Sequence, residues 1–551
     1  MSENLSALSG RKGLEKNLFE QLVEKSKVEG TPDNEDLKSL AHEYLMGEAI
    51  TYGTASFYDF LKKDHRHVKA HVCNGSACLV AGTQENVKTK LLEHYRDEEI
   101  GHMCCLGRCH ENSAFNINGN NYSGNAIEQL DKITSSHIAS LTDNYKVSSN
   151  VENPILTGER LTAAGFASLF QKVLTNGADW ALEQIKDSNI RGRGGAGFPM
   201  GIKLESCKNV SGDQKFIVCN ADEGDPGAYS DRYLLEAQPM LVLFGMMVSG
   251  YIVGADKGAL YIRGEYPESV RAVTKAVEEL SEHGMQGKKI GGSDFNFDFK
   301  VIEGAGAYIC GEETALLSSL EGQRPEVRVR PPYPTQRGLF NRPTVVNNVE
   351  TQAAIAWIVK NGGKKYARFG TSKSSGTKLV CLDSFFMNPG IYEIEMGTPF
   401  KEVVHDFGGG FKENVKAVHV GGPLGGIVPT HKIEILSLDF ESFANEGFLL
   451  GHAGVVSIPE KFPMIRYLEH LFEFTGAESC GKCFPCSIGS VRGKEMFEKA
   501  RNGETRIDRQ LLDDLLEAME DGSLCALGGG LPLGVKNALQ YFDDELRTYF
   551  K

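Results

Sequence analysis

Nine of the thirteen cysteines fall into two groups whose spacing predicts iron–sulfur clusters. The more specific group lies near the C-terminus, where three cysteines separated by two-residue gaps are followed by a distant fourth. One tight loop can cap three corners of a cubane while a remote residue supplies the fourth, as in a 4Fe–4S cluster. Zinc, the alternative metal, is more often held by two separated pairs. The predicted 4Fe–4S ligands are Cys480, Cys483, Cys486 and Cys525.

The first group contains two cysteine pairs at predicted loop positions, Cys73 with Cys78 and Cys105 with Cys109. Four thiolates on two loops suit a 2Fe–2S cluster. A Cys₄ zinc site is the alternative, although its pairs usually have two-residue gaps. Cys104 either replaces Cys105 or only packs, and the spacing leaves this open. We expect the four isolated cysteines to be small buried hydrophobic residues: Cys207, Cys219, Cys310 and Cys381.

A glycine-rich run lies between the two groups, from Arg191 to Lys203, and reads Arg-Gly-Arg-Gly-Gly-Ala-Gly-Phe-Pro-Met-Gly-Ile-Lys. Closely spaced glycines let backbone N–H groups approach a ligand without a Cβ in the way. The arginines and the lysine add positive charge that suits a phosphate. The spacing is neither that of a Walker loop nor the dinucleotide fingerprint after a strand, and a flexible loop is the alternative interpretation.

A cluster of polar residues follows a predicted strand over residues 215–219. Asn220, Asp222 and Glu223 are suited to hydrogen bonding with ribityl or ribose hydroxyls. A solvated turn would tolerate the same residues, so this pattern alone favours neither interpretation.

A second small-residue run, from Gly304 to Leu316, leads into a predicted helix that begins with Glu312 and Glu313. Two carboxylates in a first helical turn suit the helix dipole, which is the structural explanation. Beside a nucleotide they would bind ribose hydroxyls and disfavour a 2′-phosphate, which favours NAD over NADP. Tyr333 lies in a proline-stiffened turn, from which its ring can stack on a flat ligand.

The composition excludes several classes of function. Acidic residues outnumber basic ones by 73 to 59, and a net charge of −14 disfavours a nucleic-acid surface. No apolar run approaches the roughly 20 residues that span a bilayer, so we expect no direct membrane span. The start lacks the basic and apolar regions of a secretory signal. We therefore expect a cytoplasmic protein, in which disulfides are disfavoured.

The order of periodic segments predicts an α/β multidomain chain. A helical lead-in over 1–62, which we expect to pack as a small bundle, precedes a 2Fe–2S domain over 63–135 and a polar linker over 136–160. Residues 161–368 alternate strands and helices as a ligand-binding α/β domain does. Short strands fill 369–450, and a helical domain around the second cysteine group fills 451–551.

The first cysteine group resembles the thioredoxin-like 2Fe–2S domain of the small flavoprotein subunit of respiratory complex I. That family has Cys-x4-Cys followed by Cys-x3-Cys within a Cys-Leu-Gly-x-Cys loop, and the run Cys105-Leu-Gly-Arg-Cys109 matches it. The resemblance implies that Cys105 rather than Cys104 is a ligand. The stretch Thr54–Tyr58 is similar to the helical lead-in of the same family.

The remainder, from about Leu161 to the C-terminus, resembles the FMN- and NADH-binding subunit of complex I and its relatives in soluble NAD-linked hydrogenases and formate dehydrogenases. The matching motifs begin at Arg191, Asn220, Gly304 and Asn347, and Glu478-Ser-Cys-Gly-Lys-Cys-Phe-Pro-Cys486 matches the 4Fe–4S motif. The resemblance implies a Rossmann-like FMN/NAD domain, a ubiquitin-like β-grasp domain over 369–450 and a helical bundle around the 4Fe–4S cluster.

The resemblance also implies binding residues. FMN would contact Gly192, Arg193, Gly194, Gly195, Ala196, Gly197, Lys203, Asn220, Asp222, Glu223, Tyr308, Gly311, Glu312, Glu313, Asn347 and Asn348. NAD would contact Phe198, Lys203, Glu313 and Tyr333. One departure is Ser206, which stands where the family has an aromatic residue against adenine.

The expected function is that of a diaphorase subunit, with FMN, NAD(H), a 2Fe–2S and a 4Fe–4S cluster as cofactors. Hydride would pass between NADH and FMN, and single electrons would pass through the clusters to or from a partner catalytic subunit. We expect no catalytic acid or base, because the cofactors carry the chemistry. The partner belongs to a hydrogenase, a formate dehydrogenase or a complex I-like assembly, and the fused 2Fe–2S domain favours the soluble enzymes. A zinc scaffold without redox activity is the alternative from another class.

Overall fold

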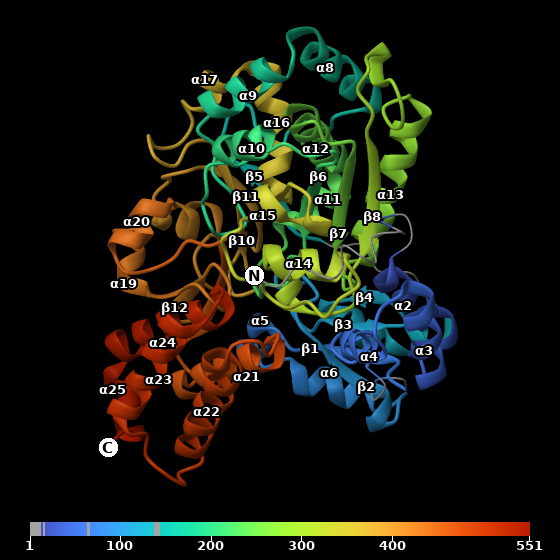
Figure 1. Cartoon of the computed structure of the whole chain (residues 1–551). Helices are drawn as coiled ribbons and strands as arrows, with labels where there is room; N and C mark the ends of the chain where they lie inside the picture. Colours follow the sequence, from blue (N-terminus) through green and yellow to red (C-terminus); the bar gives the residue numbers. More distant parts are fainter. Residues whose placement is uncertain (1–12, 15–16, 63–64, 66, 137–143) are drawn as a thin grey trace.

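The computed structural model describes residues 13–14, 17–62, 65, 67–136 and 144–551. Three β-sheets and a helical C-terminal segment form this part of the chain (Figure 1). Residues 1–12 and 15–16 of the predicted lead-in, 63–64 and 66 at its junction with the next domain, and 137–143 of the predicted linker lie outside the described residues. The N-terminal sheet, in blue, and the C-terminal helices, in red, lie at the same end of the molecule in Figure 1.

The central sheet is fully parallel, with the strand order β8-β7-β6-β9. Side chains alternate along β6, so Ile217 and Cys219 enter one core while Phe216 and Val218 enter the other. The chain reverses its direction across the sheet between β6 and β9, and open parallel sheets bind ligands beyond the carboxyl ends of the strands at such a point. The strands are β6 (Phe216–Ala221), β7 (Lys257–Ile262), β8 (Asp298–Glu303) and β9 (Thr344–Asn348).

Helices of the same domain cover the first face of this sheet. α12 packs against α16, and both lie against β6; α12 is buried along most of its length. The helices of this domain are α8 (Ala163–Asn176), α9 (Ala178–Asp187), α10 (Met200–Asn209), α11 (Ser230–Ala237), α12 (Pro239–Val253), α13 (Pro267–Glu282), α14 (Glu313–Leu320), α15 (Pro334–Arg337), α16 (Val349–Asn361) and α17 (Gly363–Tyr366). Among them, α14 packs on the other face of the sheet. Among the described residues no single helix is long and apolar enough to cross a membrane, and α11 with α12 reaches that size only as a pair bent by 94°.

The N-terminal helices cover the second face of the central sheet, which corrects the expectation of a separate small bundle. Phe19 and Leu22 share a buried cluster with Val218 and Tyr261 of the sheet and with residues of α14. The Tyr58 hydroxyl donates a hydrogen bond to Ser319 at 2.7 Å. A parallel sheet must bury both faces, and the lead-in supplies the missing layer. These helices are α2 (Leu18–Glu29), α3 (Asn34–Tyr44) and α4 (Glu48–Ala55).

The thioredoxin-like domain has a four-stranded sheet of order β2-β1-β3-β4. β1 pairs in parallel with β2, so their carboxyl ends meet at one edge of the sheet and bring the two cysteine loops together. β3 is antiparallel to β1 and to β4. The elements are β1 (Ala70–Cys73), α5 (Ser76–Val80), α6 (Gln84–Leu91), β2 (Ile100–Met103), β3 (Phe115–Ile117), β4 (Asn120–Tyr122) and α7 (Leu130–Ser136).

The third sheet has the order β13-β12-β14-β10-β11-β5, and within residues 369–459 its first strand, β10, is parallel to its last, β14, as in a β-grasp fold. Its edge strand β5 comes from the segment predicted as an irregular linker. β5 pairs with β11, and the Glu393 carboxylate accepts N–H groups from residues 155–157, which fixes the linker to the sheet. The strands are β5 (Lys146–Ser149), β10 (Thr377–Leu382), β11 (Gly390–Glu395), β12 (Val415–Val420), β13 (Gly426–Pro429) and β14 (Gly454–Pro459).

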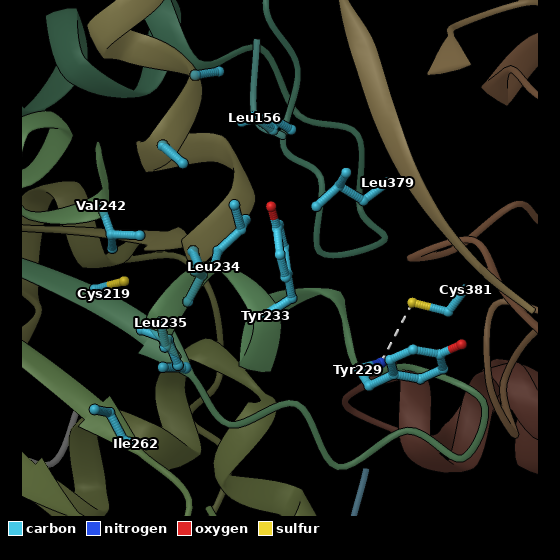
Figure 2. Close-up of a cluster of buried hydrophobic side chains, with 14 of the residues drawn as sticks. Leu156, Cys219, Tyr229, Tyr233, Leu234, Leu235, Val242, Ile262, Leu379 and Cys381 are labelled. Carbon is cyan, nitrogen blue, oxygen red and sulfur yellow. Dashed lines mark hydrogen bonds between the residues drawn. The ribbon is translucent and has the colours of Figure 1, made fainter. Parts of the chain in front are cut away.

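Tyr229 joins the central-sheet domain to the β-grasp domain. Its backbone N–H donates to Cys381 Sγ at 3.4 Å, the dashed line in Figure 2. Its hydroxyl lies 2.7 Å from the carbonyl oxygen of Leu382 and 2.9 Å from that of Gly390. Cys381 and Cys219 are buried, as are Cys207 and Cys310, which confirms the prediction that the four isolated cysteines are buried.

The C-terminal segment is a helical bundle. α21 packs along α22, and α23 packs against α22 and α24. The loops between these helices carry the second cysteine group. The helices are α21 (Met464–Glu478), α22 (Phe484–Arg501), α23 (Arg509–Gly522), α24 (Ala526–Tyr541) and α25 (Asp543–Leu546).

Candidate functional site

The glycine run forms a tight loop, residues 192–197, that we call the glycine cradle. Its ends are closed by the Gly192 N–H, which donates to the Phe198 carbonyl at 2.9 Å. Gly195 has φ +117°, a conformation that residues with a Cβ rarely adopt. A Cβ on Gly194 would lie 3.0 Å from the Cβ of Asn348, so the loop backbone lies directly against the end of β9. The cradle leads into α10.

Three other predicted stretches meet at the same edge of the central sheet. The Asn220 amide at the end of β6 donates to the carbonyl of Gly311 at 2.7 Å. Gly311 closes the short helix η5 (Tyr308–Gly311), which precedes α14. The Lys203 ammonium, on α10 after the cradle, lies 3.7 Å from a carboxylate oxygen of Glu313. Stretches that are far apart in the chain therefore meet at this edge of the sheet.

The two asparagines at the end of β9 differ in how their amides are used. Asn348 accepts the Thr351 N–H as the N-cap of α16, and its amide donates to Asp231 at 2.6 Å. Asn347 is 6% exposed, and its Nδ2 has no hydrogen-bond partner. A buried amide donor without a partner costs free energy unless a ligand accepts from it. The Asn347 amide therefore fits an oxygen of a phosphate or flavin.

The structure directs two of the predicted side chains into protein contacts. The Arg193 guanidinium is 1% exposed and donates to the Ser375 carbonyl at 2.5 Å. The Glu223 carboxylate accepts N–H groups from Asp231 and Arg232 at the start of α11. Burial raises the pKa of Glu223 to about 7, against the effect of these N–H donors. Both side chains hold the frame of the site.

The rim beside the cradle carries paired charges. Glu312 caps α14 by accepting the N–H groups of Thr314 and Ala315, which is the structural role that its position allows. Glu313 instead faces Arg330, whose guanidinium donates to it at 2.9 Å. Arg330 was missed by sequence reasoning, although it directly precedes the proline-stiffened turn with Tyr333.

Two aromatic rings at this rim are available for stacking. Phe198 is 50% exposed and Tyr333 is 54% exposed, so neither is committed to the core. Ser206 lies 3.1 Å from the Thr335 hydroxyl. A serine–threonine hydrogen bond therefore occupies the position where the resemblance leads one to expect a third ring.

Asp225 is a second residue that sequence reasoning left out of the site. Its carboxylate accepts the Tyr308 hydroxyl at 2.6 Å and lies 3.4 Å from His452 Nε2. The sequence did indicate this residue, because Asp222, Glu223 and Asp225 lie close together after β6. The prediction of binding residues included only the first two. The Asp225 carboxylate thereby orients the Tyr308 side chain, whose ring also packs against Phe474.

The four C-terminal cysteines lie against η5 and α14. Cys480 and Cys486 are buried in one cluster with Ile309 and Ala315, and Tyr308, Cys483 and Cys525 pack against it. Cys483 is the N-cap of α22, and Cys525 is the N-cap of α24. Burial raises the pKa of Cys525 to about 12, so iron binding at this residue must displace a thiol proton.

The four N-terminal cysteines lie at one edge of the thioredoxin-like sheet, and all four are buried. Cys73 ends β1 and Cys78 lies in α5, so the predicted loop positions are found only for Cys105 and Cys109. Cys105 Sγ is 3.5 Å from Cys109 Sγ. In the described part of the chain no three His, Cys, Asp or Glu side chains are arranged as the ligands of a single metal ion. The fit to iron–sulfur clusters therefore rests on the donor type, the burial and the pairing of loops.

Three family models match the chain. The Nuo51 FMN-binding domain matches residues 185–357, and the thioredoxin-like [2Fe-2S] ferredoxin matches residues 8–137. The NADH-ubiquinone oxidoreductase-F iron-sulfur binding region matches residues 466–549. These matches support iron–sulfur clusters rather than zinc at both cysteine groups.

Curated relatives cover most of the same region. The F 2 subunit of NADH-quinone oxidoreductase in Rhizobium meliloti (strain 1021) is 41% identical over 376 residues, which are 68% of this chain and 89% of the relative. The chain belongs to the family of NADH-quinone oxidoreductase F subunits. NADP-reducing hydrogenase subunit HndC of Solidesulfovibrio fructosivorans is also 41% identical, over 69% of this chain and 77% of that relative.

The likeness extends to the whole fold of this member of the F-subunit family. A chain in the crystal structure of NAD⁺-reducing [NiFe]-hydrogenase in the H₂-reduced state superposes with a TM-score of 0.85 at 29% identity, covering 97% of this chain and 94% of that chain. The chain is thus an NADH oxidoreductase module with FMN, 2Fe–2S and 4Fe–4S domains. Its relatives are subunits of multi-subunit enzymes.

Proposed function

We propose that this chain passes hydride between NAD(H) and FMN at the glycine cradle and exchanges single electrons with a partner subunit through the C-terminal cluster. The observation that carries this proposal is the position of η5, which contacts the buried Cys480 and Cys486 and also accepts the Asn220 amide from the end of β6. FMN, when bound, accepts two electrons as hydride and returns them singly. The chain contributes binding, orientation and exclusion of water.

The FMN set predicted above divides into two roles. Residues 192–197 offer backbone N–H groups and a surface without side chains, Asn347 offers its buried amide, and Asn220 and Gly311 fix the loop beside them. Arg193 and Glu223 hold the frame through protein contacts. Phe198 and Tyr333 stack on NAD rings, while Lys203 and Glu313 contact its polar groups.

The clusters take the ligands predicted from spacing, Cys73, Cys78, Cys105 and Cys109 for 2Fe–2S, and Cys480, Cys483, Cys486 and Cys525 for 4Fe–4S. Cys104 only packs, because its carbonyl and thiol contact the flavin domain. Electrons leave beside Cys483, where Phe484, Ile488 and Val491 expose apolar side chains along α22 at 75%, 52% and 44%. Such an apolar stripe suits a partner subunit of a hydrogenase, formate dehydrogenase or complex I-like assembly.

Cofactor content tests the proposal directly. Purified protein is expected to hold one FMN and about six irons per chain, the sum of the two cluster types. NADH should bleach the flavin absorbance near 450 nm, and zinc in place of iron would reject the cluster assignment. Co-purification with partner subunits identifies the assembly.

Glu313→Gln is expected to weaken NADH binding by about tenfold to a hundredfold, because hydrogen bonds to a charged group contribute about 1.5–3 kcal/mol. FMN content should stay near one per chain. The change also removes the carboxylate beside Lys203 and leaves Arg330 paired with Glu312 alone. The ratio of the KM for NADPH to the KM for NADH should therefore fall. Steady-state KM values for both dinucleotides measure this.

Glu303→Gln is the matched control, since that carboxylate pairs with Lys27 of α2 and not with Lys203 or Arg330. It should leave both KM values unchanged. Loss of FMN with an unchanged KM for NADH in Glu313→Gln would reassign this carboxylate to the flavin.

A further inference from the structure

One arginine connects the flavin domain to the N-terminal cysteine loop. Arg263 directly follows β7, and its side chain is 3% exposed. Its guanidinium donates to the carbonyl oxygens of Cys104 and Cys105, at 2.6 and 2.7 Å, and to that of Glu223 at 2.6 Å. One cation thus bonds the main chain of a cluster loop and the main chain of the loop after β6.

This arginine is fixed in position by its own surroundings. Glu265 pairs with it at 2.9 Å and is itself buried. The ring of Tyr266 lies 4.9 Å from the guanidinium carbon. The same domain adds a direct contact to a sulfur, because the Gly227 N–H donates to Cys109 Sγ at 3.2 Å.

A second arginine of the flavin domain makes the equivalent contact with the other cysteine group. Arg324 Nε and Nη2 donate to the carbonyl oxygen of Cys480 at 3.3 and 3.1 Å. Its guanidinium lies 4.7 Å from the ring of Phe57, which holds it in place. Each cysteine group therefore receives one guanidinium at the carbonyl of a proposed ligand.

We propose that Arg263 and Arg324 set the reduction potentials of the 2Fe–2S and 4Fe–4S clusters respectively, so that the flavin domain tunes both acceptors. The proposal rests on the ligand assignment of the proposed function. A cluster gains negative charge on reduction, and charge and hydrogen bonds near its sulfurs shift its potential. A buried cation at fixed distance stabilises the reduced form, since low dielectric strengthens the attraction.

The test is an EPR-monitored redox titration of the full chain carrying Arg263→Gln or Arg324→Gln. Arg263→Gln is expected to lower the 2Fe–2S potential by about 59 mV, a tenfold change in the oxidised-to-reduced ratio of a one-electron couple. The 4Fe–4S potential should move much less. Arg324→Gln should give the reverse pattern, so each variant serves as the control for the other.

Two further variants separate charge from structure. Arg263→Lys keeps the positive charge, so its 2Fe–2S potential should stay close to that of the unmodified chain. If Arg263 only held the cysteine loop in place, Arg263→Lys would shift the potential as much as Arg263→Gln does. Arg263→Gln with Glu265→Gln removes both charges and should shift the potential less than Arg263→Gln alone.

Unmoved potentials in variants that retain their clusters would overturn the proposal. If the Arg263→Gln variant does not assemble its 2Fe–2S cluster, the 4Fe–4S potential of the Arg324→Gln variant decides whether the proposal holds, because Arg324 is only partly buried. Absence of a 2Fe–2S signal from the unmodified chain would instead reject the ligand assignment, and with it the proposed function.

Discussion

Replacing Cys483 with alanine is expected to stop electron exit while NADH still reduces the flavin. Cys483 is the N-cap of α22 and one of the four proposed 4Fe–4S ligands, and it packs against a buried cluster that includes Ile309 of η5. Reduction of one-electron acceptors should fall by at least about a hundredfold, because losing even an outer partner of a metal site costs about 10–100-fold. Stopped-flow bleaching of the flavin and steady-state acceptor reduction measure the two steps separately.

Ser487→Ala is the matched control for this variant. Its hydroxyl donates to the Cys483 carbonyl at 3.2 Å on the same helix, without a predicted ligand role. It should keep its 4Fe–4S EPR signal and most of the acceptor reduction. Loss of flavin bleaching in Cys483→Ala would show that the entry site is misplaced, and full acceptor reduction would show that electrons leave elsewhere.

Replacing Lys378 with methionine is expected to destabilise the flavin domain by about 3–5 kcal/mol, the cost of leaving a buried charge unpaired. Lys378 pairs with Glu350 in the core, where their side chains are 1% and 2% exposed. Glu350 lies two positions after Asn348 and also accepts the Leu379 N–H. Asp231 lies nearby, and burial with neighbouring carboxylates raises its pKa well above the usual range while Lys378 opposes that shift.

The variant should also lose FMN, because Asn348 and Asp231 join this charge cluster to the cradle. Thermal unfolding followed by circular dichroism and by flavin fluorescence measures both effects. The control combines Lys378→Met with Glu350→Gln. Removing both charges leaves no unpaired carboxylate, so the midpoint temperature of unfolding should return most of the way to that of the unmodified chain. An unchanged midpoint in the single variant would contradict the role of the pair.

Residue type and spacing predicted the two cysteine groups and the cradle, but they left the choice between Cys104 and Cys105 open. Cys480, Cys483 and Cys486 lie within one turn of loop and helix, so their proximity is a local property that two-residue gaps reveal. The same holds for Gly192–Gly197, because a run of small residues can be recognised from the sequence without knowledge of the fold. The alternation of strands and helices likewise predicted an α/β domain, and the strand pairing shows that its sheet is parallel.

Partners far apart in the chain were not visible in the same way. Arg330 and Asp225 became candidates only when folding placed them against Glu313 and Tyr308. The N-terminal helices read as a bundle because amphipathic periodicity shows an apolar face without showing what covers it. In the folded chain these helices cover the second face of the central sheet, which would otherwise be exposed.

The sequence by itself determined the chemistry: the thiol groups, the cradle and the polar residues that suit a nucleotide are local patterns of residue type. Only the tertiary structure decided which side chains are free to act. Arg193 and Glu223 are residue types that suit a nucleotide, but their side chains make hydrogen bonds within the protein. Arg263 belongs to no recognised motif, yet it bonds a cysteine loop more than 150 positions away in the chain. Long-range burial and hydrogen bonding set these roles, because an unpaired buried polar group costs too much to leave unsatisfied.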